Sequence, residues 1–140
     1  MLIASLLVNF GLAVLIWTVQ LVIYPSFFEV EAKRFADWHN TYTTRISFLV
    51  LPLMVLQVVF FGLRLIEGGP QAITISQSVL VAFVWAMTFF ASVPCHNRLS
   101  VKKDEIQIKR LVSTNWPRTA AWSTVVILDW YLIFRQAAIT

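Results

Sequence analysis

Apolar residues fill four long blocks of the chain, and polar segments separate these blocks. The blocks cover about residues 2–28, 46–66, 73–93 and 118–136. An α-helix crosses the hydrocarbon of a bilayer with roughly 20 apolar residues, and each block is close to that length. The pattern predicts an all-α protein with a single integral membrane domain over residues 1–140, built as a four-transmembrane-helix bundle. The fourth block is the shortest and carries Asp129.

The first and third polar segments are themselves patterned as helices. In the first, Glu31, Phe35, Trp38, His39 and Tyr42 recur at the three- and four-residue spacing of one helical face. The stretch 104–112 repeats this arrangement in a shorter form. We therefore expect amphipathic interfacial helices in the first and third loops.

Capping signals place the ends of these helices. Asp104 is the expected N-cap of the second amphipathic helix. Thr114 or Asn115 is the expected cap of the fourth span, with Pro117 in its first turn. A Gly-Gly-Pro turn within 67–70 predicts that spans two and three are antiparallel neighbours.

The composition supports a membrane protein. Hydrophobic residues make up 59% of the chain and charged residues 13%, against roughly 25% charged in a soluble domain, so much of the apolar surface is expected to face the lipid bilayer. Nine of the eleven Lys and Arg residues lie in the first and third loops or at their ends. The positive-inside rule then places these loops in the cytoplasm and both termini outside it, as in a bacterial inner membrane protein. This distribution also argues against nucleic acid as a partner.

Polar residues inside the spans are expected to face the other helices. Asn9, Ala13, Gln20, Tyr24 and Phe27 share a face of the first span. Other stripes are Ser78, Ala82, Trp85, Thr88, Phe89, Ser92 and His96 in and after the third span, and Arg118, Trp122, Val125, Asp129 and Ile133 in the fourth. Such stripes serve either as helix contacts or as a functional path.

Three intramembrane polar residues stand out: Gln20, Gln57 and Asp129. Asp129 is expected near mid-membrane, with Gln57 or Arg64 as a partner. It could serve as a proton or cation site, or as a structural hydrogen-bonded carboxyl.

His39 and His96 are the only histidines and are predicted at the same membrane face. Imidazole suits metal or haem ligation and proton transfer. These two residues are therefore candidate ligands of a haem or a transition metal, with Glu31 as a further metal ligand. Candidate ligand-binding residues nearby are Tyr42, Arg45, Asn115 and Arg118. The alternative is that each imidazole bonds to backbone or lipid headgroups.

Two stretches carry a family resemblance. The first is Tyr24-Pro25-Ser26-Phe27 followed by His39, Tyr42, Arg45 and Pro52, and the second is 94–99 followed by Asn115-Trp116-Pro117-Arg118-Thr119 and Trp122. Together they resemble a family of small bacterial four-span membrane proteins of unknown function, which implies a fold and no activity. The chain is more loosely similar to anthrone-oxygenase-like membrane proteins, although the order Asn115-Trp116-Pro117-Arg118 departs from their pattern.

The sequence leaves three classes of function open. The first is a polar pocket at the cytoplasmic membrane face that binds a lipophilic molecule and supports redox chemistry on it. The second is a small oligomeric transporter that uses Asp129, and the third is a non-catalytic accessory subunit of a larger membrane complex. Whether the protein is an enzyme, and which residues would be catalytic, stays open at this stage.

Overall fold

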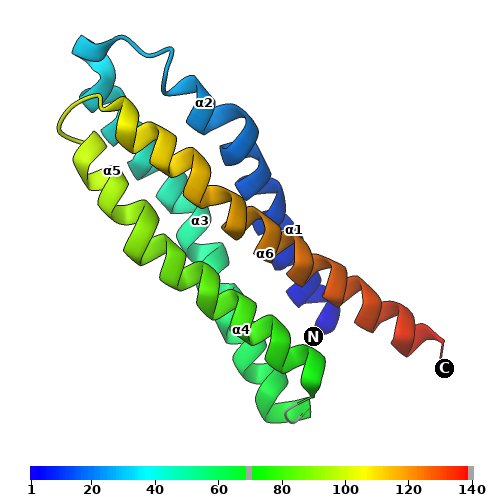
Figure 1. Ribbon diagram of the computed structural model, residues 1–140. Helices are drawn as coiled ribbons and strands as arrows, with labels where there is room; N and C mark the ends of the chain where they lie inside the picture. The colour runs from blue at the N-terminus through cyan, green and yellow to red at the C-terminus, as the bar shows by residue number, and fades with distance from the viewer. Residues whose placement is uncertain (69–70, 139–140) are drawn as a thin grey trace.

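A computed structural model describes residues 1–68 and 71–138, and all of its regular elements are helical (Figure 1). In chain order they are α1 (Leu2–Thr18), η1 (Val19–Ile23), α2 (Tyr24–Ser26), α3 (Ala32–Gly68), α4 (Ala72–Met87), η2 (Thr88–Ser92), α5 (Val93–Leu99) and α6 (Glu105–Ala137). The elements join end to end into four long helices, so the predicted all-α fold is confirmed. The predicted turn within 67–70 lies partly outside the described residues.

The amphipathic segments are not separate interfacial helices, and this part of the prediction was wrong. The first is the N-terminal part of α3, and the second is the N-terminal part of α6. No glycine or proline interrupts the chain between Ala32 and Leu51, so nothing forces a break before the apolar part of α3. Pro52 and Pro117 both lie within helices that continue past them.

The N-terminus of α6 is capped as expected. The Asp104 carboxylate accepts hydrogen bonds from the backbone N–H groups of Ile106 at 2.9 Å and Gln107 at 3.3 Å. Thr114 and Asn115 are not caps, because both lie well inside α6. The Thr114 hydroxyl instead donates to the Arg110 carbonyl at 2.7 Å.

Removing this cap gives a small, local effect. We expect Asp104→Ala to lower the free energy of unfolding by about 1 kcal/mol, since two N–H groups of the first turn lose their acceptor. Asp104→Asn keeps a side-chain oxygen as acceptor, so it should lower the free energy of unfolding by only a few tenths of that amount. Unfolding in mixed detergent micelles measures both, and equal losses in the two variants would show that the charge matters rather than the cap.

Two π-helical turns, η1 and η2, interrupt the α-helical spacing, and each is followed by a proline. The Tyr24 N–H bonds to the Val19 carbonyl, and the Val93 N–H bonds to the Thr88 carbonyl, each across five residues. Pro25 and Pro94 come directly afterwards. A π-turn accommodates one extra residue, so it can absorb the disturbance that a proline without an N–H causes.

The π-turn in the third long helix shifts which residues face the bundle. Ser92 is buried, as the predicted stripe requires, but on the other side of η2 the buried residues are Thr74, Gln77, Val81 and Val84. The predicted stripe had placed Ser78, Ala82 and Trp85 there, one residue late. In the first long helix the predicted face is confirmed, because Asn9, Ala13, Gln20, Tyr24 and Phe27 are all buried.

Three of the long helices, Leu2–Ser26, Ala32–Gly68 and Ala72–Leu99, are long and apolar enough to cross a membrane. Helix α6, which contains the predicted fourth span, is not among them. It is instead the helix with the most buried residues, including Trp122 and Asp129. Its polar side chains are shielded by its neighbours, since α6 lies along α1 and α4 (Figure 1).

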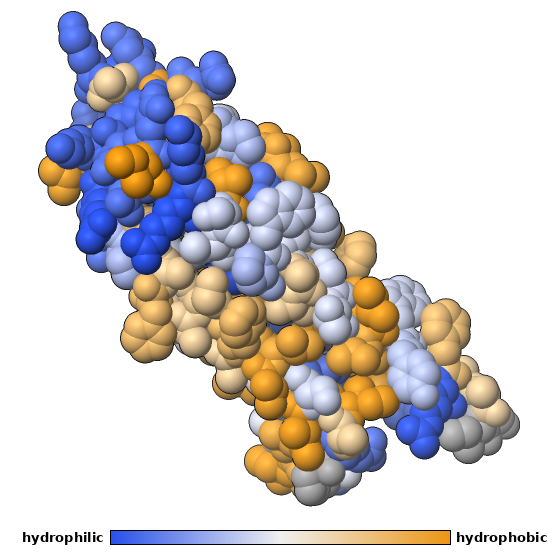
Figure 2. Space-filling view, in the orientation of Figure 1, coloured by the Kyte–Doolittle hydropathy of each residue, from blue (hydrophilic) through white to orange (hydrophobic). Residues whose placement is uncertain are grey.

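The two ends of the bundle differ in character. Both termini lie at one end, and the α2–α3 and α5–α6 connections lie at the other (Figure 1). Figure 2 shows hydrophilic residues gathered at the connection end and apolar residues along the body. The Lys103 ammonium joins the two connections, donating to the carbonyls of Phe28 at 2.7 Å and Val30 at 2.9 Å.

Candidate functional site

Two buried polar centres lie inside the bundle, one toward each end. Toward the termini is the Asp129 network, which consists of Ser5, Asn9, Gln57, Arg64, Gln77 and Asp129. Toward the connections is the histidine site, which consists of Tyr24, His39, His96, Ser100 and Arg118.

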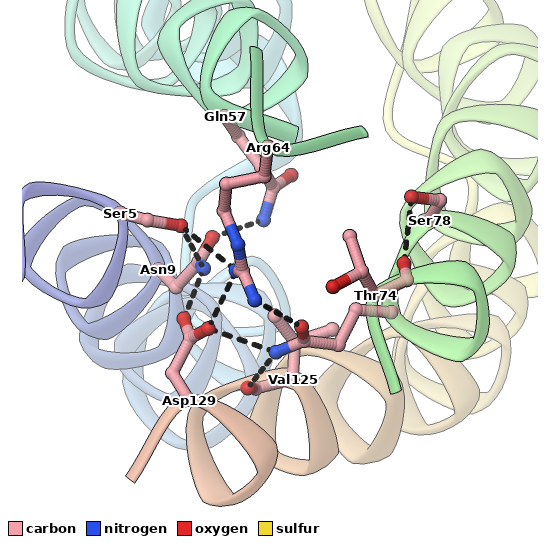
Figure 3. Close-up of polar contacts among 9 residues, drawn as sticks. Ser5, Asn9, Gln57, Arg64, Thr74, Ser78, Val125 and Asp129 are labelled. Atoms are coloured by element: carbon pink, nitrogen blue, oxygen red, sulfur yellow. Dashed lines mark hydrogen bonds and ion pairs between the residues drawn. The ribbon is translucent and has the colours of Figure 1, made fainter. Parts of the chain in front are cut away.

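The Asp129 network is built around one ion pair (Figure 3). Arg64 Nη1 donates to Asp129 Oδ1 at 2.9 Å, and Gln77 Nε2 donates to the same oxygen at 2.8 Å. Asn9 donates to the other carboxylate oxygen. Arg64 Nη2 donates to Gln77 Oε1 at 3.0 Å. Both charges therefore have several partners, and the network joins α1, α3, α4 and α6.

The partners of Asp129 differ in part from the sequence interpretation. Arg64 pairs with Asp129 as expected. Gln57 does not bond to it, but donates to Asn9 Oδ1 at 2.7 Å and accepts from Trp122 Nε1 at 3.3 Å. Gln77 was not identified as a partner from the sequence, because η2 shifts the buried face of this helix by one residue. This arrangement favours a structural role for Asp129, in which the carboxylate holds four helices together.

The histidine site brings the two histidines into direct contact. His39 Nε2 lies 3.0 Å from His96 Nδ1, and His96 Nε2 lies 3.2 Å from the Tyr24 hydroxyl. On the far side, Ser100 Oγ lies 3.5 Å from His39 Nδ1. His39 comes from the N-terminal part of α3, while His96 comes from α5 just beyond Pro94. The unbroken run of α3 is what turns His39 toward the bundle, on the same side as Gln57.

Aromatic rings fix the two imidazoles in place. Phe27 is fully buried, and its ring contacts those of Tyr24, Phe35, Trp38, His39, Tyr42 and His96, with centroids 5.4–6.5 Å apart. Phe35 also stacks on His39 at 5.6 Å. His39 has no exposed surface. Each imidazole is therefore held by packing as well as by hydrogen bonds.

The arrangement fits a metal or haem poorly. The two facing nitrogens, His39 Nε2 and His96 Nδ1, are hydrogen-bonded to each other at 3.0 Å, so each already has a partner. The two remaining ring nitrogens face Tyr24 and Ser100. Over residues 1–68 and 71–138, no three His, Cys, Asp or Glu side chains gather as metal ligands. Glu31 is exposed at the start of α3 and does not join the histidines.

Arg118 is a buried cation in this region. Its side chain is 6% exposed, and within the described part of the chain no carboxylate lies at ion-pair distance from it. Its Nη1 donates to Ser92 Oγ at 2.9 Å and to Asn115 Oδ1 at 3.0 Å. Asn115 in turn donates to Gln20 Oε1 at 2.8 Å. The guanidinium also lies over the Trp122 ring at 5.5 Å.

A cavity of about 250 Å³ lies beside Arg118, between the four long helices. Its polar lining includes Tyr24, Tyr42, His96 and Arg118, and most of its remaining wall is apolar. Arg118 Nε and Trp85 Nε1 are buried donors without a hydrogen-bond partner, and both residues line this cavity. An unsatisfied buried donor costs about 1–3 kcal/mol, and these two donors belong to residues that line the same cavity.

The predicted ligand-binding residues divide into three groups. Tyr42 and Arg118 line the cavity. Asn115 is fully buried and positions Arg118 without lining the cavity. Arg45 is exposed and borders a separate hollow on the outer side of α3. Of the predicted intramembrane residues, Gln20 belongs with Asn115 at this end, and Gln57 and Asp129 belong to the other network.

Comparison with known proteins adds no identification. No family model matches the chain, and no curated protein or solved structure matches it either. The resemblance noted from the sequence is therefore neither supported nor opposed.

Proposed function

We propose that this is a membrane protein that binds a lipophilic molecule through an anionic or carbonyl oxygen at Arg118. The observation that carries the proposal is a buried guanidinium without a carboxylate partner among the described residues, on the wall of an apolar cavity. A buried charge needs a partner or strong hydrogen bonds. An oxyanion in the cavity would supply the charge partner that the guanidinium lacks.

The cavity suits a ligand that arrives from the bilayer. Leu51, Phe89 and Val93 line it, and all three are also exposed on the outer apolar surface, at 53%, 52% and 37%. The cavity therefore reaches the surface between α3 and the η2–α5 region. A hydrophobic chain or ring could lie along this apolar wall while its polar end meets Arg118.

The membrane arrangement is part of the same proposal. We infer that α6 crosses the bilayer beside the three more apolar helices, because it is packed along α1 and α4. The positive-inside pattern then places the histidine site near the cytoplasmic face and both termini outside. Location in a bacterial inner membrane follows from the same charge pattern.

The geometry of the site bears differently on each of the other functional hypotheses. Redox chemistry on a quinone-like or aromatic ligand stays a prediction. The proposed binding of that ligand uses Arg118 and needs no metal or haem. Transport through Asp129 gains no support, because that carboxylate is already paired with Arg64 and two amides. A homo-oligomer or a larger membrane complex also stays a prediction.

Tryptophan quenching tests the binding proposal. Dibrominated stearic acid is the probe, and the four tryptophans outside the cavity, Trp17, Trp38, Trp116 and Trp130, are replaced by phenylalanine. We expect the probe to quench the fluorescence of Trp85 and Trp122. Arg118→Gln should weaken binding about ten-fold to a hundred-fold, because a charge-assisted hydrogen bond of about 1.5–3 kcal/mol is lost.

Two controls separate site binding from general membrane partition. The methyl ester of the same probe keeps a carbonyl oxygen but carries no anion, so Arg118→Gln should weaken its binding less than it weakens binding of the acid. Arg45→Gln removes an arginine outside the cavity and should leave the affinity for the acid unchanged. Equal losses in the Arg45 and Arg118 variants, or no quenching in the parent protein, would overturn the proposal.

A further inference from the structure

A row of hydrogen bonds leads from the cavity to the connection end of the bundle. It runs from the Tyr24 hydroxyl to His96 Nε2 at 3.2 Å, from His96 Nδ1 to His39 Nε2 at 3.0 Å, and from His39 Nδ1 to Ser100 Oγ at 3.5 Å. Tyr24 and His96 line the cavity. Ser100 is half-buried, and its carbonyl accepts from the exposed Asn40 at 3.3 Å. The row therefore leads from the cavity to a partly exposed serine, whose hydroxyl also donates to the His96 carbonyl at 3.0 Å.

We propose that Tyr24, His96 and His39 form a proton relay that serves an acidic lipophilic ligand bound at Arg118. The inference rests on the binding site proposed above and adds the ligand class and its proton exchange. A carboxylic acid or an acidic phenol crosses the apolar wall more readily when it is neutral, because a charge in hydrocarbon is costly. At Arg118 the anion is favoured, so a proton must leave.

Each step of the relay balances. The ligand O–H gives its proton to the Tyr24 oxygen while the Tyr24 hydroxyl proton passes to His96 Nε2. His96 then releases the proton on Nδ1 to His39 Nε2, and His39 releases the proton on its Nδ1 to Ser100 and water. The products are the ligand anion paired with Arg118 and one proton at the surface, and the tyrosine stays neutral.

The chemistry of the row suits proton transfer better than simple packing. Imidazole can accept on one nitrogen while it donates from the other, and two of the three contacts lie near the 2.6–3.2 Å reach expected for acid–base partners. The other ionisable side chains beside the row are Tyr42, Cys95 and Arg118. Among the described residues, no carboxylate hydrogen-bonds to any member of the row, so the imidazoles themselves must move the proton.

Binding kinetics with two matched probes test the relay. The first probe is dibrominated stearic acid at a pH where most of it is protonated, and the second is a dibrominated alkyl sulfonate of the same chain length. The sulfonate has no proton to lose. Stopped-flow quenching of Trp85 and Trp122 follows both. We expect Tyr24→Phe, which removes one oxygen, and His96→Asn to slow binding of the acid by at least about ten-fold more than they slow binding of the sulfonate.

The outcomes distinguish the relay from the site. If both probes bind and the variants slow them equally, or slow neither, the relay is wrong while the binding site stands. If neither probe binds to the parent protein, the proposed site fails and the relay fails with it. In the Tyr24→Phe variant, a much larger slowing of the acid than of the sulfonate supports the relay even if His96→Asn does not fold.

Discussion

Asp129→Ala is expected to lower the free energy of unfolding by about 3 kcal/mol or more, because it leaves the buried Arg64 guanidinium without its carboxylate. Loss of one partner of a buried ion pair costs about 3–5 kcal/mol. Asn9 and Gln77 also lose an acceptor. Unfolding by SDS in mixed micelles measures the loss.

A double variant shows whether the charge is the cause. Arg64→Met with Asp129→Leu removes both charges together and should recover most of the stability lost by Asp129→Ala, since no unpaired ion remains. Asn9 and Gln77 still lose their hydrogen bonds to the replaced side chains in that protein, so recovery should be incomplete. A double variant less stable than the single one would show that the network stabilises the bundle through its hydrogen bonds and not through charge pairing.

Phe27→Ala is expected to have an effect of similar size at the other end of the bundle. The ring is fully buried and contacts six other rings. Removing a buried phenylalanine ring costs about 3–5 kcal/mol, including the cavity that it leaves. Because His39 and His96 both pack on this ring, we also expect the variant to bind dibrominated stearic acid less tightly. Unfolding and tryptophan quenching measure the two effects separately.

Phe27→Leu is the matched control, since it keeps much of the volume and no aromatic ring. It should recover most of the stability that Phe27→Ala loses. It should still hold the two imidazoles less firmly than the phenylalanine ring does. If Phe27→Ala unfolds at the same denaturant concentration as the parent protein, the aromatic cluster does not hold this end of the bundle together.

Much of the bundle could be predicted from the pattern of apolar residues. Block lengths gave the positions of the long helices. His39 and Gln57, which are five helical turns apart in α3, are both buried. The approach of His39 to His96 could not be predicted in this way. It depends on how α3 and α5 pack against each other, and periodicity along one helix carries no information about its neighbour.

The third long helix shows a different limit. Its polar stripe was traced from Ser92 at ideal α-helical spacing, which ends on Ser78 and passes over Gln77. A π-turn adds one residue to a turn, so the buried face beyond it moves by one position. Pro94 is the only sign of η2 in the sequence. To find Gln77 as a partner of Asp129, the polar stripe before η2 would have to be shifted by one residue relative to the stripe after it.

The continuity of α3 and α6 was also hard to predict. Charged residues at 31–37 and 102–110 suggested that the helices change direction at the membrane surface. In the structure these segments are the N-terminal parts of α3 and α6, and their residues Phe35, Ile108 and Leu111 are buried in one cluster together with Phe27, Cys95 and Leu99. Burial in this cluster replaces the lipid interface that each amphipathic face was expected to occupy.

The buried thiol of Cys95 has a practical consequence. It is the only cysteine in the chain, it is 1% exposed, and it packs in the same cluster as Phe27 and Phe35, one residue before His96. A reagent can reach it only when α5 separates from its neighbours. If this opening is fast compared with alkylation, the labelling rate reports the free energy of the opening. Alkylation of Cys95 in the native sequence can therefore measure the motion that would uncover the histidine pair.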